Sequence, residues 1–579
     1  MNECCYDVVI AGAGLAGLSL ARHLLMYTDK TVLLLDWLEN PPGKTQKVGE
    51  SLVQLAGYYF SKTLDLEEYL LINHYLKYNL RFYWKTGARK NDFWEDVSSS
   101  SIRTVSNLAT FQLDRNELER HLLKINRENP RFRFLGGVRN LKIALSENGE
   151  AHTVSFEGGE AKGRWVVDAS GRTGILKRSM GLKKQNPIRH GATWCWVEGL
   201  VNYEKLTGLS HSEMLRRPER RQLGSFPFFL ATSHFCGEGR WFWVIPLHGK
   251  TSLGLVYEHA VIKPEEVPNA RKMLEWVCRD WPLFAEDLPK RKVLDEGRLM
   301  DYSHDAKQTI SSARWAITGV AGRFTDPLYS PGSDLISIYN TLIVDAIQTE
   351  DQTELESKCA FSEQIMRVMY ESYVPSYELS YNCLGDQEAF TLKYTFELAV
   401  YFGFFVFPFA NQLFANHAFM RSFLRKFAFF GPVNKNLHMF LREFFIWKKQ
   451  NGATAPADPV HIEFYNLEPL RLSEKMFYEI GLTVDEAEQA IEKHAERIKE
   501  FARYILAHVH AVVLGEKRAL SNARFIESLR LRDTVFDPEQ MRQAWAKHAD
   551  SEGTYRWNLN PWALECFIKE QAVAEEASA

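Results

Sequence analysis

The chain has 579 residues, of which 45% are hydrophobic and 25% charged, so we expect an ordinary globular protein of two or three domains. The net charge is −3 and no basic block occurs, which argues against a nucleic-acid partner. The cysteines lack the spacing of a zinc site, so we expect no metal, and reduced thiols indicate a cytoplasmic protein. The longest apolar run, 398–410, is shorter than the ~20 residues that a membrane-spanning helix needs.

The N-terminal region has the pattern of a dinucleotide-binding βαβ unit. A β-rich run at 6–11 leads through a glycine turn into a predicted helix at 15–26, and a second strand at 31–35 ends at Asp36. The glycine spacing allows a tight turn, close approach of a pyrophosphate and close packing of helix on strand. Phosphates are expected on the first helical N–H groups, and the acid on ribose hydroxyls. The residues expected at the phosphates are Gly12, Gly14, Leu15, Ala16 and Gly17.

Four further motifs follow along the chain. A Gly-Glu-Ser segment comes after the second strand, and an arginine precedes a predicted helix at 116–126. A strand at 165–168 ends in Asp-Ala-Ser-Gly, and a strand at 315–318 runs into a loop that contains Asp-Pro. The residues that mark these motifs are Glu50, Ser51, Arg115, Asp168, Gly319, Asp326 and Pro327.

Two segments between these motifs carry unusual side chains. Lys77 opens a predicted strand, 77–82, and is either a functional amine or a strand-edge lysine that faces water. Trp241 and Trp243 alternate along a strand in a Trp-x-Trp-x-Ile-Pro run, so they share one face. Plain aromatic packing is the alternative explanation for this pair.

In this order, the motifs resemble the flavin-dependent halogenases, a branch of the FAD monooxygenase superfamily, over residues 6 to about 345. The resemblance implies non-covalent FAD, used in its reduced form and supplied by a separate NAD(P)H-flavin reductase, since no second dinucleotide fingerprint is visible. It implies that a flavin hydroperoxide and a halide ion form hypohalous acid, which Lys77 passes to the substrate. Trp241 and Trp243 would then form a wall between flavin and substrate.

The same resemblance implies that the marked residues of the four motifs contact the flavin, together with the glycine turn and Asp36. Two positions depart from the family pattern. Val320 stands where relatives place an aspartate on the ribityl chain. Pro331 interrupts the halide-binding loop and has no N–H, which leaves Ser330 and Gly332 as halide ligands. Tyr329 stands where tryptophan halogenases carry a glutamate, which argues against free tryptophan as substrate.

Beyond residue 350 the family motifs stop. Residues 355–369 have helical periodicity, and 382–430 are dense in phenylalanine and tyrosine. We interpret the aromatic segment as core helices; an apolar substrate tunnel and a membrane-facing surface at 396–427 are the alternatives, of which we do not favour the membrane. A long amphipathic helix is expected at 484–513, and its histidines are interpreted as structural: His494, His508 and His510.

The sequence therefore predicts an α/β plus α+β fold. A Rossmann-like FAD-binding domain (1–184 and 301–349) is interleaved with an antiparallel-sheet substrate domain (185–300), and a mainly helical region follows (350–579). The leading function is an FAD-dependent halogenase of secondary metabolism, acting on an aromatic or electron-rich, bulky or apolar substrate, free or carrier-bound. A halogenase-like FAD monooxygenase or dehydrogenase that uses no halide is the alternative, and a non-catalytic, lipid-surface flavoprotein is a third.

Overall fold

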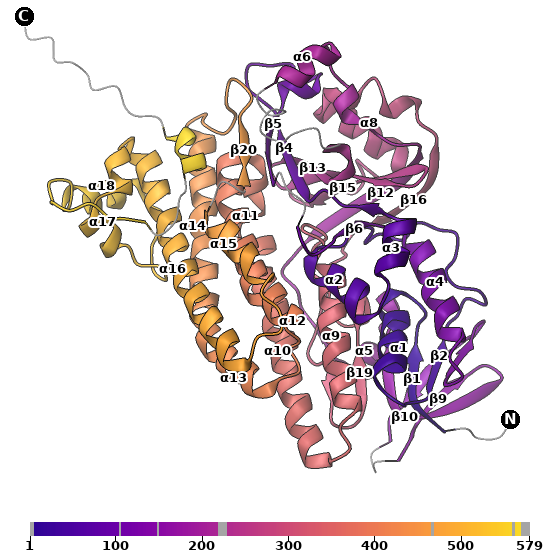
Figure 1. Ribbon diagram of the computed structural model, residues 1–579. Helices are drawn as coiled ribbons and strands as arrows, with labels where there is room; N and C mark the ends of the chain where they lie inside the picture. The colour runs from indigo at the N-terminus through magenta and orange to yellow at the C-terminus, as the bar shows by residue number, and fades with distance from the viewer. Residues whose placement is uncertain are drawn as a thin grey trace, which may run out of the picture.

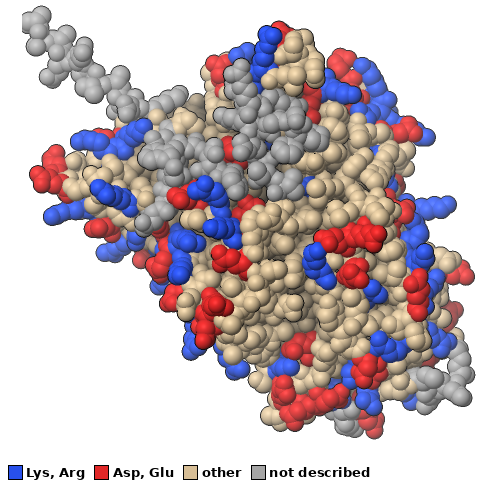
Figure 2. Space-filling view, viewed as in Figure 1, with Lys and Arg blue, Asp and Glu red and all other residues tan. Residues whose placement is uncertain are grey.

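The protein has three parts that pack against one another in the computed structural model (Figure 1). Two large sheets lie one above the other, and a body of long helices flanks both. The residues that the structure describes are 5–102, 106–146, 150–217, 228–464, 468–557 and 562–568. On the face seen in Figure 2, acidic and basic side chains are interspersed rather than gathered by sign.

The first sheet is the parallel sheet of the predicted nucleotide-binding fold. Its main path is β18-β19-β10-β1-β2-β7, and β1 is paired in parallel with both β10 and β2. The strands along this path are β18 (Ile310–Ser311), β19 (Trp315–Ile317), β10 (Gly159–Asp168), β1 (Cys5–Ala11), β2 (Val32–Leu35) and β7 (Phe132–Leu135). The antiparallel strands β9 (His152–Phe156) and β8 (Lys142–Ala144) extend it beside β10.

The central strands of the first sheet are mostly apolar because helices cover the sheet. Every residue of β2 is buried, and so are the last four residues of β1. Helix α1 (Leu15–Tyr27) packs between α4 (Arg115–Arg127) and α9 (Pro331–Ile347). The predicted strand–helix–strand unit and the predicted helix at 116–126 are confirmed within one or two residues.

The second sheet has the order β16-β12-β15-β14-β13-β4-β5-β20. Its first five strands are antiparallel neighbours, as predicted for 185–300: β16 (Val293–Leu299), β12 (His190–Glu198), β15 (Lys250–Glu258), β14 (Arg240–Leu247) and β13 (Thr232–Gly237). Helix α8 (Ala270–Asp280) packs on this sheet.

The second sheet also recruits strands from outside the range predicted for it. Strands β4 (Leu80–Trp84) and β5 (Ser98–Ser101) come from the N-terminal region, and β20 (His461–Glu463) comes from the C-terminal region. β4 joins β13 in parallel, and β20 joins β5 in parallel. The sheet is therefore mixed, and all three regions of the chain contribute to it.

The C-terminal region is a bundle of helices whose aromatic side chains point inward. The main helices are α10 (Gln352–Glu378), α11 (Gln387–Tyr401), α12 (Phe407–Ala410), α13 (His417–Phe427), α14 (Phe430–Gln450), α15 (Glu468–Met476) and α16 (Val484–Leu514). Helix α16 begins at a capping box of Thr483 and Glu486, which explains how accurately its start could be predicted. On α13, the residues Phe419, Met420, Phe423 and Phe427 are all buried.

One helix of the bundle has the length and composition of a membrane span. A π-helical turn at Phe402–Val406 joins α11 to α12, and the continuous segment Gln387–Ala410 has 24 residues, more than the apolar run at 398–410 had indicated. Of its most apolar window, 89% is buried among the other helices, as in the core helix of a globular protein. The interpretation of the aromatic segment as core helices is thus confirmed for these residues.

Candidate active site

The glycine turn has open space where a pyrophosphate is expected. A Cβ on Gly12 would lie 2.4 Å from the carbonyl oxygen of Ala169, and one on Gly17 would lie 2.0 Å from that of Gly12, so both positions require glycine. A Cβ on Gly14 would meet nothing within 4 Å. Gly14 caps α1, whose first turn has no side-chain cap and includes Leu15 and Ala16. Free N–H groups facing open space suit an anion, so this turn fits the diphosphate of FAD.

Asp36 lies beside this turn at the end of β2. Its carboxylate accepts hydrogen bonds from the backbone N–H of Ala13, at 2.6 Å, and of Leu38, at 2.8 Å. Burial raises its pKa, although both hydrogen bonds oppose that shift. The side chain thus braces the turn from the position predicted for the ribose-binding acid.

Three further predicted cofactor residues hold turns around the same edge of the sheet. Asp168 is buried and accepts from the N–H of Ser170, at 3.0 Å, and of Leu176, at 2.8 Å. Arg115 donates to the carbonyl oxygen of Val48 at 3.0 Å. Gly319 has a φ of 61°, and a Cβ there would lie 2.8 Å from the Cβ of Ala16, so it closes directly over α1.

The side chain of Asp326 is occupied by protein partners. One oxygen accepts from Nδ1 of His190 at 2.7 Å and from the hydroxyl of Tyr302 at 2.5 Å, and the side chain is fully buried. Burial opposes a charge on His190, but its hydrogen bonds with Asp326 and Glu258 outweigh burial and raise its pKa to about 9. The pair is therefore an internal ion pair next to Pro327, a partnership that the sequence motif did not reveal.

Lys77 is buried, with 1% of its surface exposed, so it is not a strand-edge lysine in water. It lies between β3 (Tyr75–Leu76) and β4 rather than in a strand, because Asn79 adopts a left-handed φ of 61° and delays the strand to Leu80. Its Nζ donates to the hydroxyl of Ser51 and to the carbonyl oxygen of Leu52, both at 2.8 Å. Burial lowers its pKa to about 7.

Glu50, which precedes Ser51, faces the second sheet instead of solvent. It accepts from the indole N–H of Trp196 at 2.6 Å and from the amide of Gln46 at 3.3 Å. Burial raises its pKa to about 7, although the hydrogen bonds oppose the shift. The Gly-Glu-Ser segment is therefore bonded to the second sheet through Glu50 and holds Lys77 through Ser51.

Trp241 and Trp243 share one face of β14, as predicted, with ring centroids 5.8 Å apart. The indole N–H of Trp241 donates to the hydroxyl of Tyr381 at 2.6 Å, and that of Trp243 donates to the hydroxyl of Ser252 at 3.1 Å. Both rings are buried, and both hydrogen bonds fix their orientation.

The predicted halide loop is the start of α9. Tyr329 and Ser330 have left-handed φ values of 68° and 61°, and Pro331 is the first helical residue. Proline suits that position because its missing N–H has no partner within the helix. The hydroxyl of Ser330 makes no capping bond, and Gly332 lies in the first turn. One turn into the helix, Asp334 accepts from the N–H of Ala56 at 2.8 Å, and burial raises its pKa to about 7.

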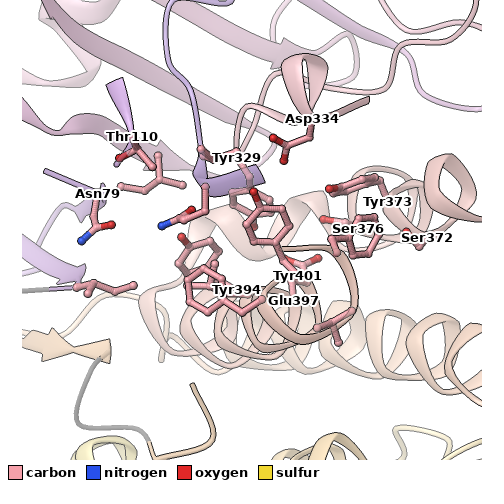
Figure 3. Close-up of a pocket in the computed structure, with 18 of the residues that line it drawn as sticks. Asn79, Thr110, Tyr329, Asp334, Ser372, Tyr373, Ser376, Tyr394, Glu397 and Tyr401 are labelled. Atoms are coloured by element: carbon pink, nitrogen blue, oxygen red, sulfur yellow. The ribbon is translucent and has the colours of Figure 1, made fainter. Parts of the chain in front are cut away.

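A pocket lies between residues of the two sheet-containing parts and the C-terminal helices. The space in it that no protein atom fills, including its open mouth, is about 830 Å³. Figure 3 shows Asn79 and Thr110 on one side of it and Ser372, Tyr373 and Ser376 on the opposite side. The N-terminal wall also includes Val53, Gln54, Lys77, Leu80, Ile102, Tyr329 and Asp334. The helical wall also includes Tyr394, Glu397, Leu398, Val400, Tyr401, Phe402, Phe405, Phe430 and Asn434. The aromatic segment thus forms both a core and one side of a cavity.

The structure brings some predicted residues to this pocket and leaves others behind it. Lys77 lines the pocket, whereas the two tryptophans do not. Trp241 contacts the ring of His234, with centroids 5.0 Å apart, and His234 stacks on Phe82 at 4.7 Å. Phe82 in turn contacts Tyr394, a pocket residue, at 4.7 Å. The tryptophan pair is therefore separated from the pocket by two layers of rings.

Sequence reasoning missed Asp334, Lys393 and Glu397. Asp334 follows Ser330 by one helical turn. Had the loop been predicted as the start of a helix, both residues would have been placed on the same helix face. Lys393 and Glu397 form an i,i+4 pair in a helix that is mostly aromatic and aliphatic from Ala389 onward, and that change in polarity was the available signal. Among the described residues, no group of three or more His, Cys, Asp or Glu side chains could hold a metal ion.

Comparisons with known proteins agree with this geometry. No family model matches the chain. The flavin-dependent halogenase chlA of Dictyostelium discoideum is 27% identical over 360 residues, which are 58% of this chain and 58% of that protein. The 1H-pyrrole-2-carbonyl-[peptidyl-carrier protein] chlorinase of Pseudomonas fluorescens is 24% identical over 61% of this chain and 78% of its own length. The alignment with chlA thus spans less than two thirds of that relative.

Among solved structures, halogenase PltM in complex with phloroglucinol and FAD has the same fold. The TM-score is 0.57 at 18% identity, and the match covers 86% of this chain and 96% of PltM. The match extends past residue 350, where the sequence motifs stop, so the helical region belongs to the shared architecture. The chain is thus similar in sequence to flavin-dependent halogenases, and it has the fold of a solved halogenase structure.

Proposed function

We propose that the chain is an FAD-dependent halogenase whose substrate binds in the pocket between the N-terminal region and the C-terminal helices. The observation that carries this proposal is Lys77, a buried amine that lines the pocket and is held by Ser51 and Leu52. A lysine is rarely buried without a partner charge in contact, so its position calls for a functional reason.

The cofactor is held, in this proposal, along the edge of the first sheet. Gly14 and the first turn of α1 bind the diphosphate, Asp36 lies at the ribose, and Gly319 closes over the turn. When bound and reduced, FAD supplies the electrons that activate oxygen for oxidation of halide. Because the chain has a single dinucleotide fingerprint, we expect a separate NAD(P)H-flavin reductase to supply the electrons. We expect the reaction to take place in the cytoplasm.

Lys77 would take up hypohalous acid and present it to the substrate. A pKa near 7 leaves an appreciable share of the amine neutral at neutral pH, and the neutral form is nucleophilic. The two hydrogen bonds from Nζ fix the amine in place without neutralising it electrostatically. Ser51 is therefore a positioning residue in this proposal.

The pocket favours an apolar or aromatic substrate of some size. Its helical wall presents phenylalanine, tyrosine and leucine side chains, which contact rings and alkyl chains rather than charged groups. PltM, by the description of its structure, binds phloroglucinol, and the Pseudomonas relative is named for a carrier-bound pyrrole. A free or carrier-bound electron-rich aromatic compound fits both of these and the pocket.

Pro331 favours a second candidate, an FAD monooxygenase or dehydrogenase that uses no halide. It removes one N–H at the start of α9, leaving the Ser330 hydroxyl and the Gly332 N–H for an anion. Loss of one donor to a charged group costs about 1.5–3 kcal/mol, which predicts weak halide binding.

The test is product analysis by mass spectrometry with reduced FAD, oxygen and either bromide or chloride, with monochlorodimedone and phenols as acceptors. A halogenated product that requires halide supports the proposal. An oxygenated or dehydrogenated product formed equally well without halide would establish the second candidate instead.

A further inference from the structure

Helix α11 carries an ion pair into the wall of the pocket. The ammonium of Lys393, with 1% of its side chain exposed, lies 3.0 Å from both carboxylate oxygens of Glu397, one turn further along the helix. From Ala389 to Tyr401 the helix is otherwise aromatic or aliphatic except for Thr391 and Thr395. Burying an ion pair costs desolvation energy that apolar residues of the same size would avoid, so stability alone is a weak reason for it.

Lys393 and Glu397 differ in how many hydrogen-bonding positions remain free for a ligand. Lys393 donates to the hydroxyls of Ser376, at 2.8 Å, and Tyr329, at 3.0 Å, besides Glu397, so its three N–H groups are used. A carboxylate has about four acceptor positions, and Lys393 fills two of those on Glu397. The side chain of Glu397 remains 14% exposed and lines the pocket.

The neighbouring histidine donates no hydrogen bond to this carboxylate. Nε2 of His438 lies 3.4 Å from Glu397 but makes no hydrogen bond, while its Nδ1 is within 2.8 Å of the hydroxyl of Ser380. Burial lowers the pKa of His438 to about 4, so the ring is neutral at neutral pH. Glu397 therefore faces the cavity as an acceptor whose hydrogen-bond partners, among the described residues, are Lys393 and the hydroxyl of Tyr329.

The other carboxylate of the pocket is less accessible to a ligand. Asp334 is 1% exposed; one of its oxygens accepts from the N–H of Ala56, and the other, Oδ2, is buried without a hydrogen-bond partner among the described residues. Asp334 also lines the pocket and acts on Lys77 through its charge. Glu397 belongs to the facing wall, which the C-terminal helices supply (Figure 3).

We propose that Glu397 is the residue that recognises the substrate, by accepting a hydrogen bond from an O–H or N–H group on its aromatic ring. The inference rests on the proposed function, because it takes Lys77 on the facing wall as the point of halogen transfer. A ring anchored at Glu397 presents its remaining edge to Lys77, so the carboxylate selects which ring position reacts. Lys393 is a positioning residue that holds Glu397 in place at the cavity.

The test compares matched ligand pairs that differ by one hydrogen-bond donor. Phenol and anisole, and indole and N-methylindole, are titrated into the FAD-loaded, oxidised enzyme, and binding is followed by isothermal titration calorimetry. The wild type should bind the donor member of each pair about tenfold more tightly, as expected for one hydrogen bond to a charged group. Equal affinity for both members would overturn the proposal.

Two variants keep the test independent of folding. Glu397→Gln leaves Lys393 without its counter-charge, so the double variant Glu397→Gln/Lys393→Met removes the pair as a whole at nearly constant volume. Both keep only a neutral acceptor, the glutamine amide oxygen, so the preference for the donor ligand should fall well below tenfold. Glu356→Gln, an exposed glutamate on α10, is the charge-matched control and should keep it. A double variant that folds and retains the tenfold preference would show that Glu397 does not bind the donor.

These binding measurements involve no halide, oxygen or turnover. A donor preference that depends on Glu397, in an enzyme that yields no halogenated product, would uphold the recognition site and refute the proposed reaction. A halogenated product from an enzyme with no donor preference would uphold the proposed reaction and refute the recognition site.

Discussion

Lys77 donates a hydrogen bond of 2.8 Å to the hydroxyl of Ser51, and this contact joins two motifs that are 26 residues apart in the sequence. Ser51 also lies 2.8 Å from the hydroxyl of Thr232, at the start of β13. The amine is thus anchored, through Ser51, to the second sheet. Anchoring of this kind fixes where a reactive group stands relative to a bound cofactor.

Lys77→Ala should abolish halogenation while FAD stays bound. The side chain lines the pocket and contacts none of the glycine turn, so its loss should reduce product formation about a hundredfold or more with an unchanged flavin spectrum. Rates of product formation and of flavin reoxidation are measured side by side. Lys90→Ala, at an exposed lysine, is the control. Loss of FAD from Lys77→Ala would make this lysine a cofactor or structural residue.

The pH dependence should report the buried amine. Burial lowers the pKa of Lys77 from 10.5 to about 7, so kcat/KM should rise with pH through the neutral range as the amine loses its proton. Because the unfolded state binds the proton more tightly, stability should also rise with pH between about 7 and 10.5, and below 7 the folded state bears the full cost. Lys77→Met should therefore raise the melting temperature more at pH 6 than at pH 9. An equal gain at both pH values would contradict the lowered pKa.

Asp334→Asn should move that pH profile. The carboxylate favours the charged form of Lys77, so removing its charge should shift the rise in kcat/KM to lower pH. The measurement is the midpoint of the profile in the variant and in the wild type, with product detected by mass spectrometry. A fall in kcat at all pH values with the midpoint unmoved would mean that Asp334 acts only through the N–H of Ala56 that it holds.

Gly14→Val should remove FAD without unfolding the chain. A side chain at Gly14 meets nothing within 4 Å, so unfolding free energy should change by no more than about 1 kcal/mol, whereas the valine would occupy the space of the diphosphate. Flavin absorbance of the purified protein and its thermal unfolding without FAD are the two measurements. Gly12→Ala is the contrasting variant and should destabilise the fold, since its Cβ would press on Ala169. If the Gly14→Val protein retained its full content of flavin, the diphosphate would have to bind elsewhere than at this turn.

Pro331→Thr should strengthen halide binding. The substitution restores one N–H at the start of α9, and one recovered bond to an anion is worth about 1.5 kcal/mol, or roughly tenfold in the apparent halide constant. Initial rates against bromide and chloride concentration give that constant, and bromide should serve better because it is easier to desolvate and oxidise. An unchanged constant would show that the halide lies elsewhere or that none is used.

The sequence predicted those parts of the fold that depend only on residues close together in the chain. The glycine turn follows from steric demands at Gly12 and Gly17, and the start of α16 follows from the capping box at Thr483. The assembly of the second sheet did not follow, because pairing of β4 with β13 and of β5 with β20 depends on contacts between distant parts of the chain.

The candidate site divides in the same way. Lys77 was found from its motif, but its burial depends on residues 51–52 and on the helical region that closes the pocket. Asp326 was assigned from its place in a loop, and only the fold shows it paired with His190 across 136 residues. Pairs of this kind cannot be recognised from a sequence pattern, because each partner alone looks like any other polar residue.

Strand β20 has a consequence for how the chain is made. Because β5 pairs with a strand at His461–Glu463, its outer edge stays without a partner until that segment has left the ribosome. Unpaired strand edges are the sites at which nascent proteins associate with one another. The protein therefore passes through a long interval of synthesis in which most of both sheets is complete while one edge is exposed. Chains that stop after α14 would keep that edge open and would be expected to aggregate.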